Sequence, residues 1–121
     1  MGRLTLLLCD SPFHHESVDE ALDIAQEALA QGHSVHLFLM MDGVYAAYTK
    51  QSGEPFGVVA PHDRLAELIK AGALVGCCRV CMELRGIREG DIPEGVEVSG
   101  LFDLSEAIES ADTVLSFVRR G

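Results

Sequence analysis

The stretch ALVGCCRVCMELRGI, residues 73–87, decides how the chain folds. Residues 73–77 form a short apolar run that is typical of a buried strand, and residues 79–85 are predicted to form a short helix that ends at Gly86. Cys78 then lies at the junction, where unpaired backbone N–H groups and the positive end of the helix dipole favour a sulfur anion. Three of the nine Lys and Arg residues lie within ten positions of this cysteine: Arg79, Arg85 and Arg88. We expect a locally positive environment in a chain that is acidic as a whole.

Short apolar runs alternate with amphipathic segments along the chain. Strands are predicted at residues 4–9, 35–40, 73–77, 96–99 and 113–118. Helices are predicted from Ser17 until Gly32, with Ser17 and Glu20 forming its cap, and at residues 62–71, 79–85 and 103–110. Residues 44–50 are expected to form one or two helical turns before a loop at residues 51–61. The alternation predicts βαβ units in a single domain, residues 1–121: a three-layer α/β/α sandwich with a mainly parallel five-stranded sheet.

Composition and charge restrict the classes of function. With 121 residues, 48% of them hydrophobic and 23% charged, the chain is long enough for one globular core. The formal net charge of -10 and the total of nine Lys and Arg argue against nucleic acid and anionic membranes as partners, because both require a basic face. The motifs GxGxxG, the P-loop, GxSxG and HExxH do not occur, so nucleotide chemistry and hydrolysis have no support from sequence motifs.

The start of the chain and its cysteines indicate a compartment. The first ten residues contain an apolar run of six residues, which is too short for the core of a signal peptide. No stretch approaches the ~18 apolar residues of a membrane span, so we expect a cytoplasmic protein. Its four cysteines, three of them clustered, are then expected to be reduced and catalytic or metal-binding rather than paired in structural disulfides.

The residues that follow the predicted strands are expected to share one edge of the sheet. In an open α/β sheet, reactive groups gather outside the carboxyl ends of the strands. The residues at this edge would be Asp10 with Ser11, Met41 with Asp42, Cys78, Gly100 and Arg119. The predicted topology therefore places Cys78 at the functional edge, in agreement with its position before a helix.

Cys78 and Cys81 form a CxxC motif at the strand-to-helix junction. One helical turn brings the second sulfur close to the first. The helix dipole favours a thiolate by about 0.3–1 kcal/mol, or roughly 2 kcal/mol in partly buried geometry, which makes Cys78 the predicted nucleophile. The alternative is that both side chains pack as small hydrophobic residues, and Cys81 one turn into the helix is the stronger candidate for this role. Cys77, which strand alternation points away from Cys78, and Cys9 are interpreted as structural.

A metal site is the competing use of these thiols. Structural zinc commonly requires four ligands from two CxxC-like pairs, and the sequence contains one such pair. His14, His15 or His62 could complete a site, but no spacing favours any of them, so we predict no metal and no cofactor. His14 and His15 could also serve as proton donors in the first loop of the edge, although such residues more often lie at a solvated loop tip.

Four segments carry a resemblance to a known family. They are LFLMMDGV at residues 37–44, CRVCMELRGI at residues 78–87, EGVEVSGLFDL at residues 94–104 and SADTVLSF at residues 110–117. With these segments the chain resembles the DsrE/DsrF/TusD-like sulfur-relay family, closest to its stand-alone YchN-type branch. The resemblance spans nearly the whole chain, and the pattern C-x-x-C-x-x-x-R-G-I is fairly specific to this branch.

The resemblance implies a parallel α/β sandwich that assembles as a homotrimer or homohexamer. In the sulfur-relay members, the cysteine eight residues before the glycine of the RG pair carries a persulfide, and this position is Cys78 here. The resemblance further implies a TusA-like sulfur donor and an acceptor thiol protein as partners, in tRNA thiolation or in sulfur oxidation or reduction. Relay members usually lack the second cysteine, so Cys81 leaves open whether the branch transfers sulfur or cycles through a disulfide.

Three hypotheses follow for the function. The first is a sulfur carrier that holds sulfane sulfur as a persulfide on Cys78, with Cys81 as a spectator or as a resolving thiol, and with sulfurtransferase-like activity if it is an enzyme. The second is a CxxC dithiol redox module or oxidation sensor. The third is a non-catalytic oligomeric binding protein whose cysteines pack in the core.

Overall fold

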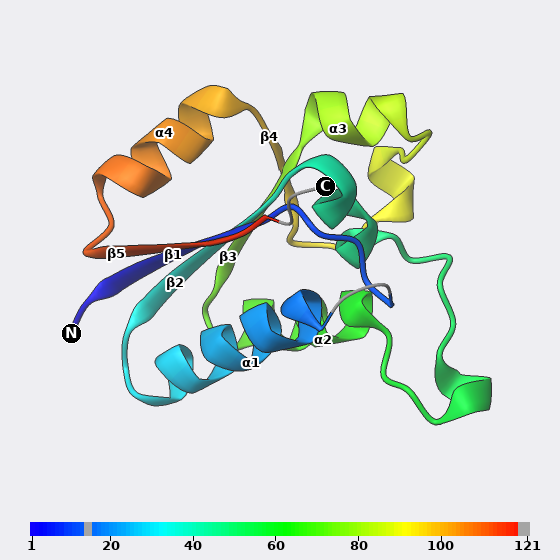
Figure 1. Cartoon of the computed structure of the whole chain (residues 1–121), viewed down its shortest axis with the longest axis horizontal. Helices are drawn as coiled ribbons and strands as arrows, with labels where there is room; N and C mark the ends of the chain where they lie inside the picture. Colours follow the sequence, from blue (N-terminus) through cyan, green and yellow to red (C-terminus); the bar gives the residue numbers. More distant parts are fainter. Residues whose placement is uncertain (14–15, 119–121) are drawn as a thin grey trace.

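The computed structural model describes residues 1–13 and 16–118, in which five strands form one sheet (Figure 1). The strands are β1 (Arg3–Leu8), β2 (Ser34–Leu39), β3 (Leu74–Cys78), β4 (Glu97–Ser99) and β5 (Thr113–Phe117). Their order is β4-β3-β2-β1-β5, and every neighbouring pair is parallel. The predicted five-stranded parallel α/β fold is confirmed.

Helices cover both faces of this sheet. They are α1 (Ser17–Ala30), α2 (Pro61–Lys70), α3 (Arg79–Leu84) and α4 (Leu101–Glu109). Figure 1 shows α1 and α2 together on one face, with α3 and α4 on the other. Three short 3₁₀ helices lie in the connections: η1 (Met41–Ala47), η2 (Glu54–Phe56) and η3 (Glu89–Asp91). Among the described residues, no helix is long and apolar enough to cross a membrane.

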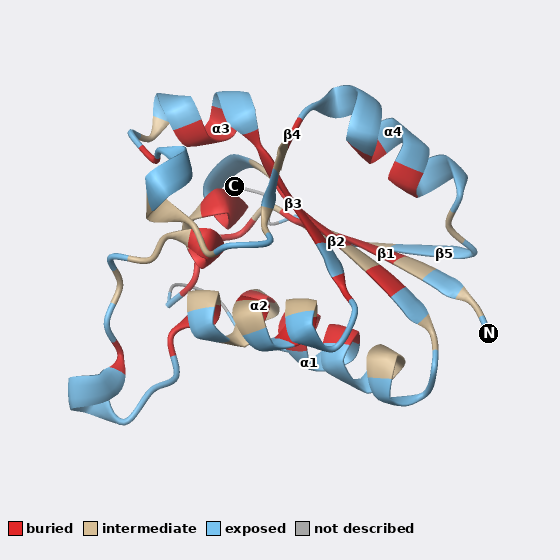
Figure 2. Ribbon diagram, turned by 180° about the vertical axis from the view of Figure 1, so that it is seen from behind, coloured by how far each residue is buried: buried red, intermediate tan, exposed pale blue. Residues whose placement is uncertain are grey.

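The core is densest between the sheet and the layer of α1 and α2. In β1 and β2, Leu6 pairs with Leu37, and both side chains are fully buried. Thr5, the neighbour of Leu6, faces the opposite side, where its hydroxyl donates to the Ala107 carbonyl of α4 at 2.8 Å. Because side chains alternate along a strand, Leu6 and Leu37 face α1 and α2. Buried positions shown in Figure 2 concentrate in the central strands and on the inner sides of the helices.

Some boundaries differ from the prediction for local reasons. Ser17 was expected to cap α1, but it is the first helical residue, and its hydroxyl donates to the buried carboxylate of Asp10 instead. The helix predicted at residues 103–110 begins two residues earlier, because the Gly100 N–H donates to the Asp103 carboxylate and closes the first turn. The turns predicted at residues 44–50 also begin earlier, as the 3₁₀ helix η1, directly after β2.

Candidate functional site

Cys78 ends β3 and is the N-cap residue of α3. The strand continues one residue further than predicted, and Cys78 pairs in register with Ser99 of β4. Its backbone is extended, with φ -65° and ψ 122°, and its sulfur accepts a hydrogen bond from the Cys81 N–H at 3.4 Å. A sulfur at the N-cap therefore faces a backbone donor of the following turn, as the sequence predicted.

The surroundings of Cys78 are tighter than expected. Cys78 and Cys81 are each 7% exposed. Only a small part of either residue is accessible to solvent, and neither lies in an open cleft. α3 has six residues, which limits the contribution of the helix dipole and leaves the direct N–H···S bond as the main stabilising contact for a Cys78 anion. Arg79 is paired with Glu89 at 3.1 Å, which reduces its electrostatic effect on the sulfur.

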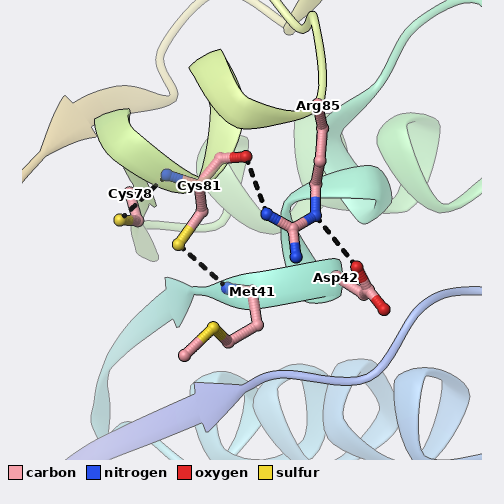
Figure 3. A network of polar contacts seen from close by, with 5 residues as sticks. All are labelled: Met41, Asp42, Cys78, Cys81 and Arg85. Atoms are coloured by element: carbon pink, nitrogen blue, oxygen red, sulfur yellow. Dashed lines mark hydrogen bonds and ion pairs between the residues drawn. The ribbon is translucent and has the colours of Figure 1, made fainter.

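The Cys81 sulfur points to the loop after β2 (Figure 3). It accepts a hydrogen bond from the Met41 N–H at 3.1 Å. Burial and a side-chain hydrogen bond with Cys78 raise the pKa of the Cys81 thiol, while the Met41 N–H and the Arg85 charge act in the opposite direction.

An ion pair holds the loop after β2 against α3. The Arg85 Nε donates to the Asp42 Oδ1 at 2.9 Å, and the Arg85 Nη1 donates to the Cys81 carbonyl at 3.0 Å. Gly43 allows this loop to approach β1, because a Cβ at this position would collide with the Leu8 carbonyl. One guanidinium thus connects the loop after β2 with the CxxC helix.

The other two cysteines differ from the pair. Cys77 is fully buried, and burial raises the pKa of its thiol to about 12, as expected for a structural residue. Cys9 was also interpreted as structural, yet it is half-buried, and its pKa is raised by burial, by Asp10 and by the charge of Cys81. Cys9 therefore lies within electrostatic range of the reactive pair. All four cysteines are free thiols.

A groove of about 390 Å³ is lined by Arg79, the residue after Cys78, and by seven further residues. It is lined by residues of α3, by the segment leading into η3 and by Val98 of the edge strand β4. Two arginines, Arg79 and Arg88, and two glutamates, Glu83 and Glu89, contribute to its walls. A partner that approached this groove would meet a mixed-charge surface next to the strand end that carries Cys78.

Among the described residues, no group of three or more His, Cys, Asp and Glu side chains is arranged to hold a metal ion. His62 is within 3.5 Å of Asp63 and belongs to α2, on the other face of the sheet from α3. His14, His15 and Arg119, which were considered for the functional edge, lie outside the described residues.

The sequence prediction missed the contact between Asp42 and Arg85. Asp42 was interpreted as part of a turn, and Arg85 as one of several nearby positive charges. The two residues are 43 positions apart, and no local pattern joins them. The only available signal was topological, because Asp42 follows β2 and belongs to the same edge of the sheet as Cys78.

Comparisons with known proteins agree with this fold. Residues 2–117 match the model of the DsrE/DsrF-like family. The protein MJ0989 of Methanocaldococcus jannaschii is 32% identical, and the match covers 95% of this chain and 99% of that protein. Protein YchN of Escherichia coli is 30% identical over 97% of this chain and 100% of its own length. The crystal structure of the E. coli YchN protein superposes with a TM-score of 0.87, covering 97% of this chain and 100% of that one.

A relative with a named activity is more distant. Sulfurtransferase TusD of Cronobacter sakazakii is 26% identical, and the match covers 95% of this chain and 99% of that protein. The family model spans nearly all of the chain, and the matched relatives are aligned over almost their full length. The chain therefore belongs to the DsrE/DsrF-like family and is of the YchN type.

Proposed function

We propose that the protein is a sulfur carrier that accepts and passes on sulfane sulfur as a persulfide on Cys78. The observation that carries this proposal is the position of the Cys78 sulfur, at the carboxyl end of a parallel strand and opposite the Cys81 N–H. A sulfurtransferase among the relatives supports sulfur transfer as the reaction class. Within sulfur transfer, the proposal specifies Cys78 as the carrier residue and its persulfide as the intermediate.

The transfer is a pair of thiol exchange reactions. The Cys78 thiolate attacks the terminal sulfur of a donor persulfide, so that a new S–S bond forms and the donor leaves as a thiolate. An acceptor thiolate then attacks the terminal sulfur of Cys78–S–SH, and Cys78 leaves as a thiolate. The Cys81 amide stabilises the Cys78 anion before the first step and after the second. No external oxidant is required, because the sulfane sulfur keeps its oxidation state.

The partners proposed for these steps are a TusA-like donor and a protein with an acceptor thiol. The groove along α3 starts at Arg79, the residue after Cys78, and its paired charges favour a protein surface over a strongly charged polymer. Because Cys78 itself is mostly buried, the donor has to present its persulfide on a narrow, protruding segment. A reducing cytoplasm is the compartment that suits four free thiols.

Mass spectrometry of the intact protein tests the proposal. After incubation with a small persulfide donor, the native protein should gain about 32 Da, which corresponds to one sulfur atom, and the adduct should be released by a reducing thiol. Cys78→Ser should abolish the adduct. Cys9→Ser is the matched control, because Cys9 is also near the edge but has no backbone donor to its sulfur among the contacts of the described residues. An adduct that survives in Cys78→Ser would reject Cys78 as the carrier.

A dithiol redox cycle is the second candidate, and the closeness of the two cysteines, shown by the Cys81 N–H that donates to the Cys78 sulfur at 3.4 Å, favours it. In this cycle a peroxide would oxidise both thiols to a disulfide and leave as water. The mass would fall by about 2 Da without an adduct, and the loss would require both cysteines. If neither mass change occurs in the native protein, the cysteines act as packing residues.

Self-association is proposed for the same molecule. α3 and α4 expose five large apolar side chains: Val80, Leu84, Leu101, Phe102 and Ile108. Exposed apolar surface of this kind is typical of a protein interface, and a homotrimer or homohexamer would cover it. Light scattering should give a mass of three or more chains, and a stable monomer would contradict this assembly.

A further inference from the structure

The loop after β2 contains a residue, Met41, with an unfavourable backbone conformation. Met41 has φ 51°, in the left-handed region, which costs a residue with a side chain about 1 kcal/mol. The Met41 side chain is exposed, so packing of this side chain does not explain the conformation. Its N–H donates to the Cys81 sulfur at 3.1 Å. The conformation of Met41 therefore serves to aim a backbone donor at this thiol.

Two contacts keep Met41 in this position. Gly43 lets the chain pass directly over the Leu8 carbonyl, and Arg85 binds the Asp42 carboxylate from the side of α3. The same guanidinium donates to the Cys81 carbonyl, so it fixes both the donor loop and the acceptor residue. The Arg85 side chain is 21% exposed, whereas its partner Asp42 is 58% exposed. Figure 3 shows the resulting arrangement of Met41, Asp42, Cys81 and Arg85.

The charges around Cys81 depend on the state of Cys78. In the unloaded protein, burial and the hydrogen bond to Cys78 raise the pKa of Cys81, so Cys81 keeps its proton. When Cys78 carries sulfur, its inner sulfur is bonded to the cargo, so the contributions of the Cys78 thiol to the raised pKa of Cys81 are removed. The Met41 N–H and the positive charge of Arg85 remain, and both favour the Cys81 thiolate. Loading of Cys78 thus shifts Cys81 from the thiol towards the thiolate.

We propose that Arg85 is a positioning residue that, through Asp42 and the Met41 amide, prepares Cys81 to resolve a persulfide on Cys78. The inference rests on the sulfur-carrier function proposed above and adds a second fate for the cargo. A loaded carrier that meets an acceptor passes the sulfur on, and one that meets none discards it. Arg85 sets the rate of the second route.

The resolving step balances without a further oxidant. The Cys81 thiolate attacks the inner sulfur of Cys78–S–SH, the bond between the inner and terminal sulfur breaks, and the terminal sulfur leaves as hydrosulfide. The sulfane sulfur is reduced to sulfide, and the two cysteine sulfurs are oxidised to a disulfide. A low-molecular-weight thiol then reduces the Cys78–Cys81 disulfide and restores the carrier.

Two measurements on Arg85→Gln test the role. The first is the pH dependence of Cys81 alkylation by iodoacetamide in a Cys78→Ser background, which needs no sulfur transfer. The second is the rate of sulfide release from the persulfide-loaded protein with Cys78 intact. We expect the alkylation midpoint to move to higher pH, and sulfide release at pH 7 to slow by about fivefold, as for the loss of one net hydrogen bond. Persulfide loading on Cys78 should be retained.

Arg64→Gln is the matched control. Arg64 also binds carboxylates, Asp19 and Asp23, and its side chain is 23% exposed, but it lies on α2 and contacts no cysteine. Its substitution should leave both measurements unchanged. Arg85→Lys keeps the charge but cannot hold Asp42 and the Cys81 carbonyl together, so we expect values between those of the native protein and Arg85→Gln.

The outcomes separate this role from the carrier function. An unchanged alkylation midpoint and sulfide release in a folded Arg85→Gln protein overturn the role of Arg85, even if Cys78 carries sulfur. Equal shifts in Arg64→Gln and Arg85→Gln overturn it as well, because they would reflect a general change of charge. If the native protein takes up no sulfur but the midpoint moves in Arg85→Gln alone, the carrier function is rejected and the positioning of Cys81 by Arg85 stands.

Discussion

The two faces of the sheet are built from different residues. On the face of α1 and α2, Leu6 and Leu37 pair with each other and are fully buried. On the face of α4, the neighbouring pair is Thr5 and His36, which are polar. Among the described residues, α1 and α2 expose one large apolar side chain, Ile24, whereas α3 and α4 expose five. The first face holds the buried leucines, and the second carries the CxxC motif and most of the exposed apolar side chains of these four helices.

We expect the largest difference in the free energy of unfolding between two Leu→Ala variants, one from each face of the sheet. Leu22→Ala on α1 removes a fully buried side chain and should lower the free energy of unfolding by about 3 kcal/mol. Leu101→Ala on α4 changes an exposed side chain and should have an effect within about 0.5 kcal/mol in a monomer. Urea unfolding measures both. A large effect of Leu101→Ala that depends on protein concentration would show that a second copy buries this face.

Alkaline pH should lower the free energy of unfolding, because Cys77 is buried on the face of α1 and α2. Its pKa is raised from 9.0 to about 12 by burial, so the folded state keeps a proton that the unfolded chain loses. Stability from this group is fully present below pH 9 and is lost as the pH rises towards 12, by roughly 2.5 kcal/mol at pH 11. Urea unfolding at pH 8 and pH 11 measures the loss. Cys77→Ala should show a smaller decrease between the two pH values, and an equal decrease would contradict the assignment.

The connection between the two faces depends on Gly43. The 3₁₀ helix η1, which contains this residue, packs against both α2 and α3. Gly43→Ala would place a methyl group against the Leu8 carbonyl, and we expect a loss of about 2 kcal/mol in the free energy of unfolding. Gly90→Ala is a suitable control, because a Cβ at Gly90 meets no atom within 4 Å. Equal stabilities of the two variants would show that η1 moves away from β1 without cost.

The smallest expected effect concerns His36 on the face of α4. Burial lowers its pKa from 6.5, although the charges of Glu97 and Asp103 partly oppose this. The folded state therefore favours neutral His36, and its contribution is present above pH 6.5 and lost as the pH falls through the lowered value. Thermal unfolding at pH 7.5 and pH 5 measures this loss, and His36→Gln should reduce it. A pH dependence that is unchanged in His36→Gln would assign the effect to other groups.

Much of the fold followed from local patterns, and much of the site did not. The apolar runs of the strands and the helix that begins at Ser17 depend on neighbouring residues, so the sequence predicted them within one or two positions. Cys78 was placed correctly at the junction of a strand and a helix, although β3 includes it and ends one residue later than predicted. The bond between Met41 and Cys81 spans 40 positions and uses a backbone donor, which no residue pattern reports. The degree of burial of Cys78 likewise depends on packing from several elements.

The strand order has a consequence for how such a protein can diverge. β1 and β2 occupy the middle of the sheet with β3 beside them, while the reactive sulfur is attached to the last residue of β3, next to the three-residue edge strand β4. Substitutions in β4 and η3 can reshape the approach to that sulfur without altering the central strands. The surroundings of Cys78 can therefore vary at the perimeter of the sheet while the inherited scaffold stays intact.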